Sequence, residues 1–208
     1  PAEDAPSWRA ADIDGHCRFI LESLAGAARP VILAGSGIRA ANALAEFEAV
    51  IRRLGIPVTT AWTHDTIASD DPLFCGRPGT IGTRAGNFTV QNADVVLVLG
   101  SRLNIRQVSY NWKSFARDAF VIQVDIDAAE LDKPLVRPAH SIHCDLKPRL
   151  ASLAQSLDGG AFDAAKHAGW LAWCRERVAK YPPVSPRQRE CSGPVNPYHF
   201  VEELFRQL

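Results

Sequence analysis

Two closely spaced glycines, Gly35 and Gly37, are the first feature of the sequence that could bind a ligand. With Ser36 between them, they begin the run GSGIRA, which has the spacing Gly-x-Gly-x-x-Ala after a short apolar segment. Glycines at this spacing, between a buried strand and a helix, form a turn whose backbone can approach the phosphates of a dinucleotide. The helix that follows would direct its N–H groups and the positive end of its dipole at the turn, so phosphates are the natural ligands. A tight turn that binds nothing is the alternative interpretation.

Charged side chains follow the later apolar segments of the chain. Gly100, Ser101, Arg102 and Arg106 follow the segment 95–99, Asp125 and Ile126 follow 120–124, and Asp145 follows 141–144. If these segments are parallel strands, ligands bind beyond their C-terminal ends. Two guanidinium groups suit a diphosphate, and an acid suits ribose hydroxyls or an adenine amino group. Alternatively, the charges pair with one another at the rim, for example Arg102 with Asp125.

The chain lacks other recognisable catalytic patterns. A nicotinamide site places an acid at the tip of its second strand, about 20 residues after the glycines. Here the segment 57–60 runs into Ala61 and Trp62 instead. No P-loop, no Gly-x-Ser-x-Gly motif and no pair of catalytic carboxylates is present, and His140 and His143 would diverge on a strand. We therefore expect no catalytic residue and no metal site within this chain.

Strands and helices that alternate along the chain would position these residues. The apolar runs at 30–34, 95–99 and 120–124 are typical of parallel strands that are covered on both faces, and residues 57–60 are predicted to form a further short strand. Apolar residues at helical spacing predict helices at about 13–24, 40–54 and 146–157, and a short helix is expected at about 87–92. This alternation predicts an α/β fold with a doubly wound parallel sheet.

Composition limits the possible partners and the compartment. The formal net charge of zero provides no electrostatic reason to expect nucleic acid or a membrane surface as a partner. No apolar run approaches the roughly 20 residues that span a bilayer, and no signal peptide is visible. The five cysteines are scattered without a C-x-x-C pair, which fits a reducing, cytoplasmic environment better than a disulfide framework.

The chain is expected to contain three parts. Residues 1–160 form the α/β domain, residues 161–194 form a helix and a proline-rich linker, and residues 195–208 form the first helix of a truncated C-terminal domain. Asn196 and Pro197 are suited to begin that last helix. Because the sequence begins at Pro1 and contains no Met, we expect it to be a piece of a longer protein.

Three segments, in their order and spacing, carry a resemblance to a known family. The segments are RPVILAGSG at 29–37, ADVVLVLGSRL at 93–103 and VDIDAAEL at 124–131. The chain resembles, from about residue 7 to residue 157, the central domain of thiamine-diphosphate-dependent enzymes of the acetolactate synthase type. The resemblance implies a three-layer, Rossmann-like fold of the FAD- and NAD-binding kind, with a roughly six-stranded parallel sheet.

The resemblance also implies a parent enzyme that decarboxylates or ligates 2-keto acids with thiamine diphosphate and Mg. Its catalytic glutamate and its diphosphate motif would lie in the two other domains, and Asn196-Pro197 resembles the start of the last of these. The chain alone is therefore expected to be inactive. The expected partners are the other domains and further copies of the full-length enzyme.

Central domains of this family bind FAD, ADP or nothing. The contacts that the resemblance transfers to this chain are Gly35, Ser36, Gly37, Gly79, Thr80, Ile81, Gly100, Ser101, Arg102, Arg106, Asp125, Ile126 and Asp145. The family motif Gly-x-Arg-Phe-x-x-Arg reads GSRLNIR at 100–106, with both arginines present, Leu103 in place of the Phe, and no acid near the middle.

Two other readings of the glycine turn are considered. A stand-alone NAD-dependent Rossmann oxidoreductase would need the acid that is absent beyond Thr60 and a catalytic Tyr-Lys or His-Asp arrangement. A sirtuin-like deacylase is suggested by the run AGSGI at 34–38, but the scattered cysteines do not supply its zinc site.

Overall fold

A parallel five-stranded sheet forms the centre of the protein, whose computed structural model describes residues 13–63, 65–134, 136–160, 162–190 and 193–208. The strands are β1 (Pro30–Ala34), β2 (Val58–Thr60), β3 (Val95–Leu99), β4 (Phe120–Asp125) and β5 (His140–His143). Their order across the sheet is β2-β1-β3-β4-β5. A single parallel bridge joins Val58 to Phe74 beyond β2. The predicted doubly wound α/β fold is confirmed, and the sixth strand is reduced to this bridge.

The order of the strands reverses between β1 and β3, at the middle of the sheet. β1 is followed in sequence by β2 on one side, and β3 pairs with its other side. The pairing runs from Pro30 opposite Val95 to Ala34 opposite Leu99, so the two strands end level with each other. In doubly wound sheets this reversal is where ligands bind. The loops after β1 and β3 therefore lie at the expected position of a site.

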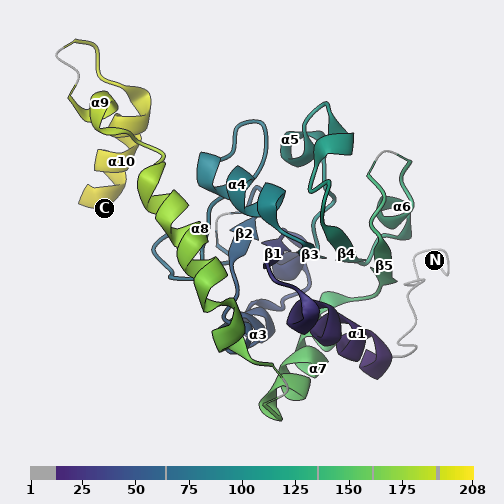
Figure 1. The fold of residues 1–208 in the computed structure, drawn as a ribbon. Coiled ribbons are helices and arrows are strands. Elements are labelled where there is room, and N and C mark those ends of the chain that lie inside the picture. The colour runs from purple at the N-terminus through teal and green to yellow at the C-terminus, as the bar shows by residue number, and fades with distance from the viewer. Residues whose placement is uncertain (1–12, 64, 135, 161, 191–192) are drawn as a thin grey trace.

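Helices cover both faces of the sheet (Figure 1). On one face lie α1 (Ile13–Gly26), α3 (Leu44–Leu54) and α7 (Leu146–Asp158), and on the other lie α4 (Arg84–Asn92), α5 (Ile105–Val108) and η2 (Trp112–Ser114). Successive residues of β1 alternate between the two cores, with Ile32 in the first and Val31 and Leu33 in the second. The period of two along a strand thus divides one short apolar run between two hydrophobic cores.

The helix after the glycine turn differs from the sequence prediction. A single helix was expected at about 40–54, whereas the structure contains a one-turn helix, α2 (Gly37–Ala40), and then α3. Between them Asn42 has a φ of 52°, in the left-handed region that Asn tolerates better than most residues. The prediction of one helix is wrong because this residue breaks the helical path. A single turn also sums few peptide dipoles, so the field at the glycines is weaker than expected.

The C-terminal segments leave the sheet along a long helix. Two short helices, α6 (Ala128–Leu131) and η3 (Ala164–His167), precede β5 and α8 respectively. Helix α8 (Ala168–Lys180) packs against α4. The buried indole Nε1 of Trp170 donates a hydrogen bond of 2.9 Å to the carbonyl of Pro30, which fixes α8 to the start of β1. Among the described helices none is both long and apolar enough to cross a membrane.

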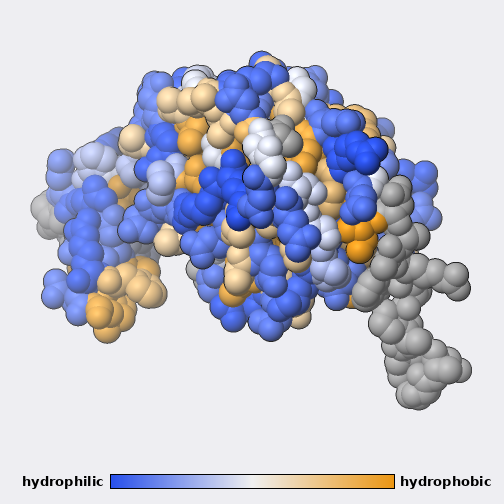
Figure 2. Space-filling model, turned by 90° about the horizontal axis from the view of Figure 1, so that it is seen from below, coloured by the Kyte–Doolittle hydropathy of each residue, from blue (hydrophilic) through white to orange (hydrophobic). Residues whose placement is uncertain are grey.

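The last two helices extend away from the sheet at the far end of α8 (Figure 1). They are α9 (Pro186–Arg189) and α10 (Pro197–Gln207), which pack against each other. Apolar side chains gather at the end of this projection, at the left of Figure 2, while hydrophilic side chains cover most of the remaining face shown. The exposed apolar residues of this segment are Val195, Tyr198, Phe200, Val201, Leu204, Phe205 and Leu208.

Candidate functional site

The glycine turn after β1 packs directly on the turn after β3. The Gly35 N–H donates to the carbonyl of Leu99 at 2.8 Å, and the Gly37 N–H donates to the carbonyl of Gly100 at 3.0 Å. A Cβ on Gly37 would lie 2.7 Å from the Cα of Gly100. The glycines are therefore required by contact between the two turns. The N–H groups at the start of the following helix are predicted to face a phosphate, but that of Gly37, the first residue of α2, is already used within the protein.

A cavity of about 180 Å³ lies beside these turns, at the C-terminal ends of the strands. Its lining residues are Gly37, Ala40, Ala41, Gly100, Asp125, Ile126, Asp145 and Leu146. Five of the residues predicted from the sequence are thus brought together from the ends of β1, β3, β4 and β5. Ala40, Ala41 and Leu146 were not predicted, because small and apolar lining residues carry no signal of their own in the sequence.

Asp125 provides a buried carboxylate to this cavity. The residue is only 7% exposed, and burial raises the pKa of its carboxyl above the ordinary value, although backbone N–H groups, including that of Asp127 at 3.1 Å, act in the opposite direction. Ile126 beside it is exposed and offers an apolar surface. A carboxylate next to an apolar patch can accept hydrogen bonds from sugar hydroxyls or an amino group while a ring packs on the patch.

Asp145 has a structural task as well as a position in the cavity. Its carboxylate accepts a hydrogen bond of 2.9 Å from the N–H of Lys147 and caps the N-terminus of α7. Such a cap explains an acid at this position without any ligand. Its place in the lining of the cavity still leaves it available to a bound molecule.

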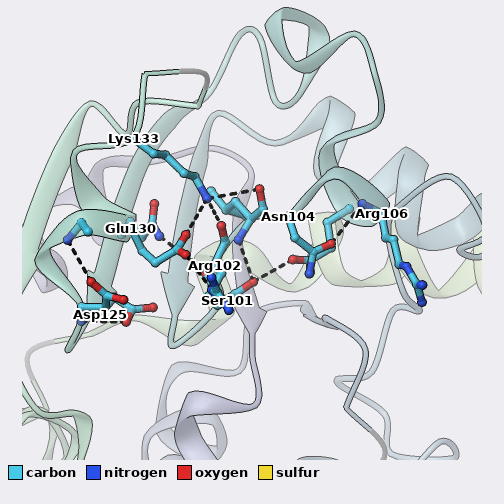
Figure 3. Close-up of polar contacts among 12 residues, drawn as sticks. Ser101, Arg102, Asn104, Arg106, Asp125, Glu130 and Lys133 are labelled. Atoms are coloured by element: carbon cyan, nitrogen blue, oxygen red, sulfur yellow. Dashed lines mark hydrogen bonds and ion pairs between the residues drawn. The ribbon is translucent and has the colours of Figure 1, made fainter.

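Arg102 forms an ion pair with Glu130 of α6 instead of the Asp125 pair considered from the sequence. Its Nε and Nη2 atoms lie 2.7 Å and 2.5 Å from the same carboxylate oxygen of Glu130 (Figure 3). Lys133 binds the other carboxylate oxygen of Glu130 at 3.1 Å and also donates to the backbone carbonyl of Arg102. The arginine is thus held by α6.

Arg106 lies apart from Arg102, and the two side chains diverge in Figure 3. The guanidinium of Arg106 stands 5.1 Å from the centre of the Trp62 ring, in a cation–π contact. Its backbone N–H is bound by the side chain of Asn104, which caps α5. The two arginines that were expected to share a diphosphate therefore do not converge.

The predicted residues of the long loop line a different cavity. Asn87 holds Gly79 through two hydrogen bonds, of 2.9 Å and 3.0 Å, and the N–H of Thr80 donates to the Arg106 carbonyl at 2.8 Å. Gly79 and Thr80 line a cavity of about 220 Å³ that shares no lining residue with the first, and Ile81 is exposed. The predicted residues that line a cavity therefore fall into two groups, one at the strand ends and one in the long loop.

The two predicted serines make no direct contribution to either cavity lining. Ser101 is buried, and its hydroxyl donates to the side-chain oxygen of Gln107 at 2.9 Å. Its carbonyl accepts a hydrogen bond of 3.0 Å from the side chain of Gln123. Ser36 immediately precedes α2, and its side chain makes no capping hydrogen bond to this helix. Ser101 therefore connects the loop after β3 to β4, which is a structural role.

The matched family covers the whole sheet. Residues 17–153 match the family model described as thiamine pyrophosphate enzyme, central domain. The chain belongs to this family. It is 34% identical to a probable acetolactate synthase large subunit of Methanocaldococcus jannaschii, over 99% of this chain and 34% of that protein. The resemblance identified in the sequence is confirmed.

Further relatives carry two kinds of name. The acetolactate synthase large subunit of Lactococcus lactis is 36% identical, over 68% of this chain and 24% of its own length. The sulfoacetaldehyde acetyltransferase of Castellaniella defragrans is 35% identical, over 72% of this chain and 25% of its own length. The chain spans about a third or less of these three relatives.

The described residues do not fit the metal ion that accompanies thiamine diphosphate. The one candidate group of ligands that they contain, on α10, consists of His199, Glu202 and Glu203. Each of its carboxylates is already paired, Glu202 with Arg189 at 2.6 Å and Glu203 with Arg206 at 2.5 Å. Carboxylates neutralised by arginine are poor ligands for Mg, which prefers unpaired oxygen ligands. The one candidate ligand group in the described part of the chain is therefore unsuited to the metal ion of this cofactor.

Proposed function

We propose that the chain is the central domain of a thiamine-diphosphate-dependent enzyme that decarboxylates or ligates 2-keto acids, and that it docks an adenine nucleotide, ADP or FAD. The observation that supports docking is the cavity at the strand ends, which combines the buried carboxylate of Asp125 with the exposed surface of Ile126. The catalytic cofactors, thiamine diphosphate and Mg, would be held by other domains. The chain alone is then inactive on 2-keto acids.

The dimensions of the cavity favour the adenosine part of the nucleotide. Its volume of about 180 Å³ is below the roughly 300–1,000 Å³ of pockets that enclose drug-sized ligands. Asp125 would accept a hydrogen bond from the ribose or the adenine amino group, and Ile126 would support the ring. ADP would place its phosphates near Gly100, whereas the flavin of FAD would extend outside the cavity. ADP is therefore the better fit of the two.

Other domains and further copies of the enzyme are the proposed partners. The relatives are about three times as long as this chain, which supports additional domains. The exposed apolar residues of α10, among them Phe200 and Phe205, support a protein partner at that end. The cytoplasm is the proposed compartment because the cysteines that the structure describes are all unpaired thiols.

A stand-alone NAD-dependent oxidoreductase is the competing proposal. β2 ends at Thr60, and the exposed Trp62 lies two residues beyond it, where a nicotinamide site would place an acid. Asp125 is an acid at a strand end, but it follows β4 and not the second strand. The arrangement therefore favours ADP or FAD over NAD.

Calorimetric titration of the whole 208-residue chain with ADP, FAD and NAD tests the proposal. We expect ADP to bind, FAD to bind no more tightly than ADP, and NAD to give no turnover with alcohol or hydroxy-acid substrates. Asp125→Asn should weaken ADP binding about tenfold, because a hydrogen bond to a charged group contributes about 1.5–3 kcal/mol.

The control for this variant is Asp118→Asn, which alters an exposed acid whose recorded ion pair is with the neighbouring Arg117. It should bind ADP as the unchanged chain does. The absence of heat with both ADP and FAD would leave the family membership standing and reject nucleotide docking. Conversion of pyruvate by the chain alone would reject the division of labour between domains.

A further inference from the structure

The ion pair between Arg102 and Glu130 holds against α6 an arginine that the sequence predicts to bind phosphate. Arg102 lies two residues beyond Gly100, which lines the strand-end cavity. Both recorded contacts of its guanidinium with Glu130, through Nε and Nη2, use the edge of the group that binds carboxylates and phosphates in a two-pronged manner. While Glu130 occupies this edge, a phosphate cannot use it.

Glu130 is the fixed partner of the pair. Its side chain is 15% exposed, whereas that of Arg102 is 73% exposed. Lys133 binds the second oxygen of Glu130 at 3.1 Å and a backbone carbonyl of Leu103 at 3.4 Å. Burial acts to raise the pKa of the Glu130 carboxyl, but its bonds from Arg102 and Lys133 outweigh burial and lower it, so the carboxylate is charged at neutral pH.

Arg102 can therefore exchange one anionic partner for another without disturbing the fold. Because most of the Arg102 side chain is in water, its pair with Glu130 is of the solvent-screened kind that contributes little to stability. Lys133 would keep its contact with the carboxylate and with the loop after such an exchange. Glu130 can therefore compete with an anionic ligand for Arg102, and such a ligand can displace it.

We propose that Glu130 lowers the affinity of the crevice for nucleotides, because it competes with the phosphates of a bound nucleotide for Arg102. This inference rests on the proposed nucleotide docking. A diphosphate presents more negative charge to the guanidinium than a monophosphate and displaces Glu130 more readily. Every nucleotide that uses Arg102 must break the same ion pair, so Glu130 weakens nucleotide binding without touching the nucleotide and cannot itself raise the preference for ADP over AMP.

The test measures ADP and AMP affinity by calorimetry for the whole chain and for Glu130→Gln. Glutamine keeps the size of the side chain and an acceptor for Lys133, and removes the charge that holds Arg102. We expect ADP to bind about fivefold more tightly to Glu130→Gln, the equivalent of about 1 kcal/mol. AMP should gain no more than ADP, because a monophosphate that displaces Glu130 less readily has less affinity to recover, so the preference for ADP over AMP should persist or widen.

Two further variants assign the effect to Arg102. Arg102→Gln should weaken ADP binding, and in that background Glu130→Gln should change the affinity less than twofold. Asp132→Asn removes a charge from the segment after α6 whose recorded pair is with Arg137, at 3.9 Å, and should leave ADP affinity within twofold of the unchanged chain. Thermal unfolding of each variant verifies that it is folded.

Each other result overturns the inference in a recognisable way. Equal affinity of ADP for the unchanged chain and Glu130→Gln would reject the role of Glu130 and leave docking in place. A gain that persists in the Arg102→Gln background would show that Glu130 acts only through its charge. The absence of ADP binding in every variant would reject both the competition and the proposed docking.

Discussion

Gly35 and Gly100 touch through their backbones at the point where the strand order reverses. A Cβ on Gly35 would lie 2.1 Å from the carbonyl oxygen of Gly100 and 2.6 Å from the Cα of Ser101. Real Cβ atoms do not approach backbone atoms this closely, and backbone cannot move aside as a flexible side chain can. The turns after β1 and β3 therefore form one unit, and its integrity determines the shape of the cavity beside it.

Substitution of Gly35 by Ala should push apart the turns after β1 and β3 and destabilise the protein. Overpacking of a well-packed site costs about 1–3 kcal/mol, and we expect about 3 kcal/mol here because the clash involves backbone. Urea unfolding measures the change. Gly26→Ala is the matched control, since a Cβ at Gly26 meets nothing within 4 Å, and its stability should be unchanged or slightly higher. Similar stability of the two variants would contradict the close contact.

The sheet could be predicted from the sequence because its strands are short apolar runs with distinct ends. Val95–Leu99 contains only Val and Leu and was predicted with its observed bounds. The break between α2 and α3 could not be predicted, because the apolar spacing of 40–54 continues across Asn42 and its φ of 52° depends on the packing around it. The sixth strand of the expected sheet is reduced to an isolated bridge between Phe74 and Val58.

The site could be predicted only in part, because residue types do not reveal directions. Asp125 and Ile126 follow a strand and reach the cavity, as their position indicated. Arg102 and Arg106 are four residues apart and looked equivalent, yet one is held by Glu130 and the other stacks on Trp62. These partners come from segments distant in sequence. The one available signal was Glu130 itself, which lies within the segment VDIDAAEL.

The carboxylate of Asp94 should be an important tie between the first and third strands. Its two oxygens accept hydrogen bonds of 2.8 Å from the backbone N–H groups of Ala28 and Arg29, just before β1. Asp94→Ala should lower the free energy of unfolding by about 2 kcal/mol, because two backbone donors lose a charged partner. Asp94→Asn keeps one acceptor and should lose about half as much.

Urea unfolding of both Asp94 variants measures this effect, with Asp118→Ala as the control. Asp118 is exposed, its recorded pair with Arg117 is 3.5 Å long, and its removal should change stability by no more than about 0.5 kcal/mol. Equal losses in Asp94→Ala and Asp118→Ala would contradict the tie.

Asp125 should make the protein less stable as its carboxyl ionises. Burial raises its pKa in the folded state above the ordinary value of 3.8, so between those two values the folded state binds more protons than the unfolded chain. The stability that this group contributes is therefore present at acid pH and is lost as the pH rises through the raised pKa.

Asp125→Asn removes this titration and retains the size of the side chain. The variant should be more stable than the unchanged chain at neutral pH, and the difference should shrink as the pH falls toward about 4. Urea unfolding at several pH values measures it. If Asp125→Asn is more stable at neutral pH and also binds ADP more weakly, then Asp125 serves ligand binding and lowers the stability of the free protein. A variant that is less stable at neutral pH would contradict the cost of burial.

His167 should make the docking of α8 sensitive to acid. The residue is 1% exposed at the start of α8, its ring stacks on Phe162 at 5.3 Å, and neither ring nitrogen has a hydrogen-bond partner among the described residues. Burial lowers the pKa of the imidazole below its ordinary 6.5, and the nearby Lys166 adds to this effect. The folded state therefore holds His167 neutral.

The direction of the pH dependence follows from that neutral state. Below about pH 6.5 the unfolded chain binds a proton at this residue while the folded protein does not, so stability falls as the pH drops through this window. His167→Phe keeps the stacked ring and removes the titration, so it should lose less stability than the unchanged chain between about pH 7 and about pH 5. Lys166→Gln removes the neighbouring charge and should give an intermediate dependence. Parallel loss of stability in the unchanged chain and His167→Phe, measured by urea unfolding, would assign the acid sensitivity to other groups.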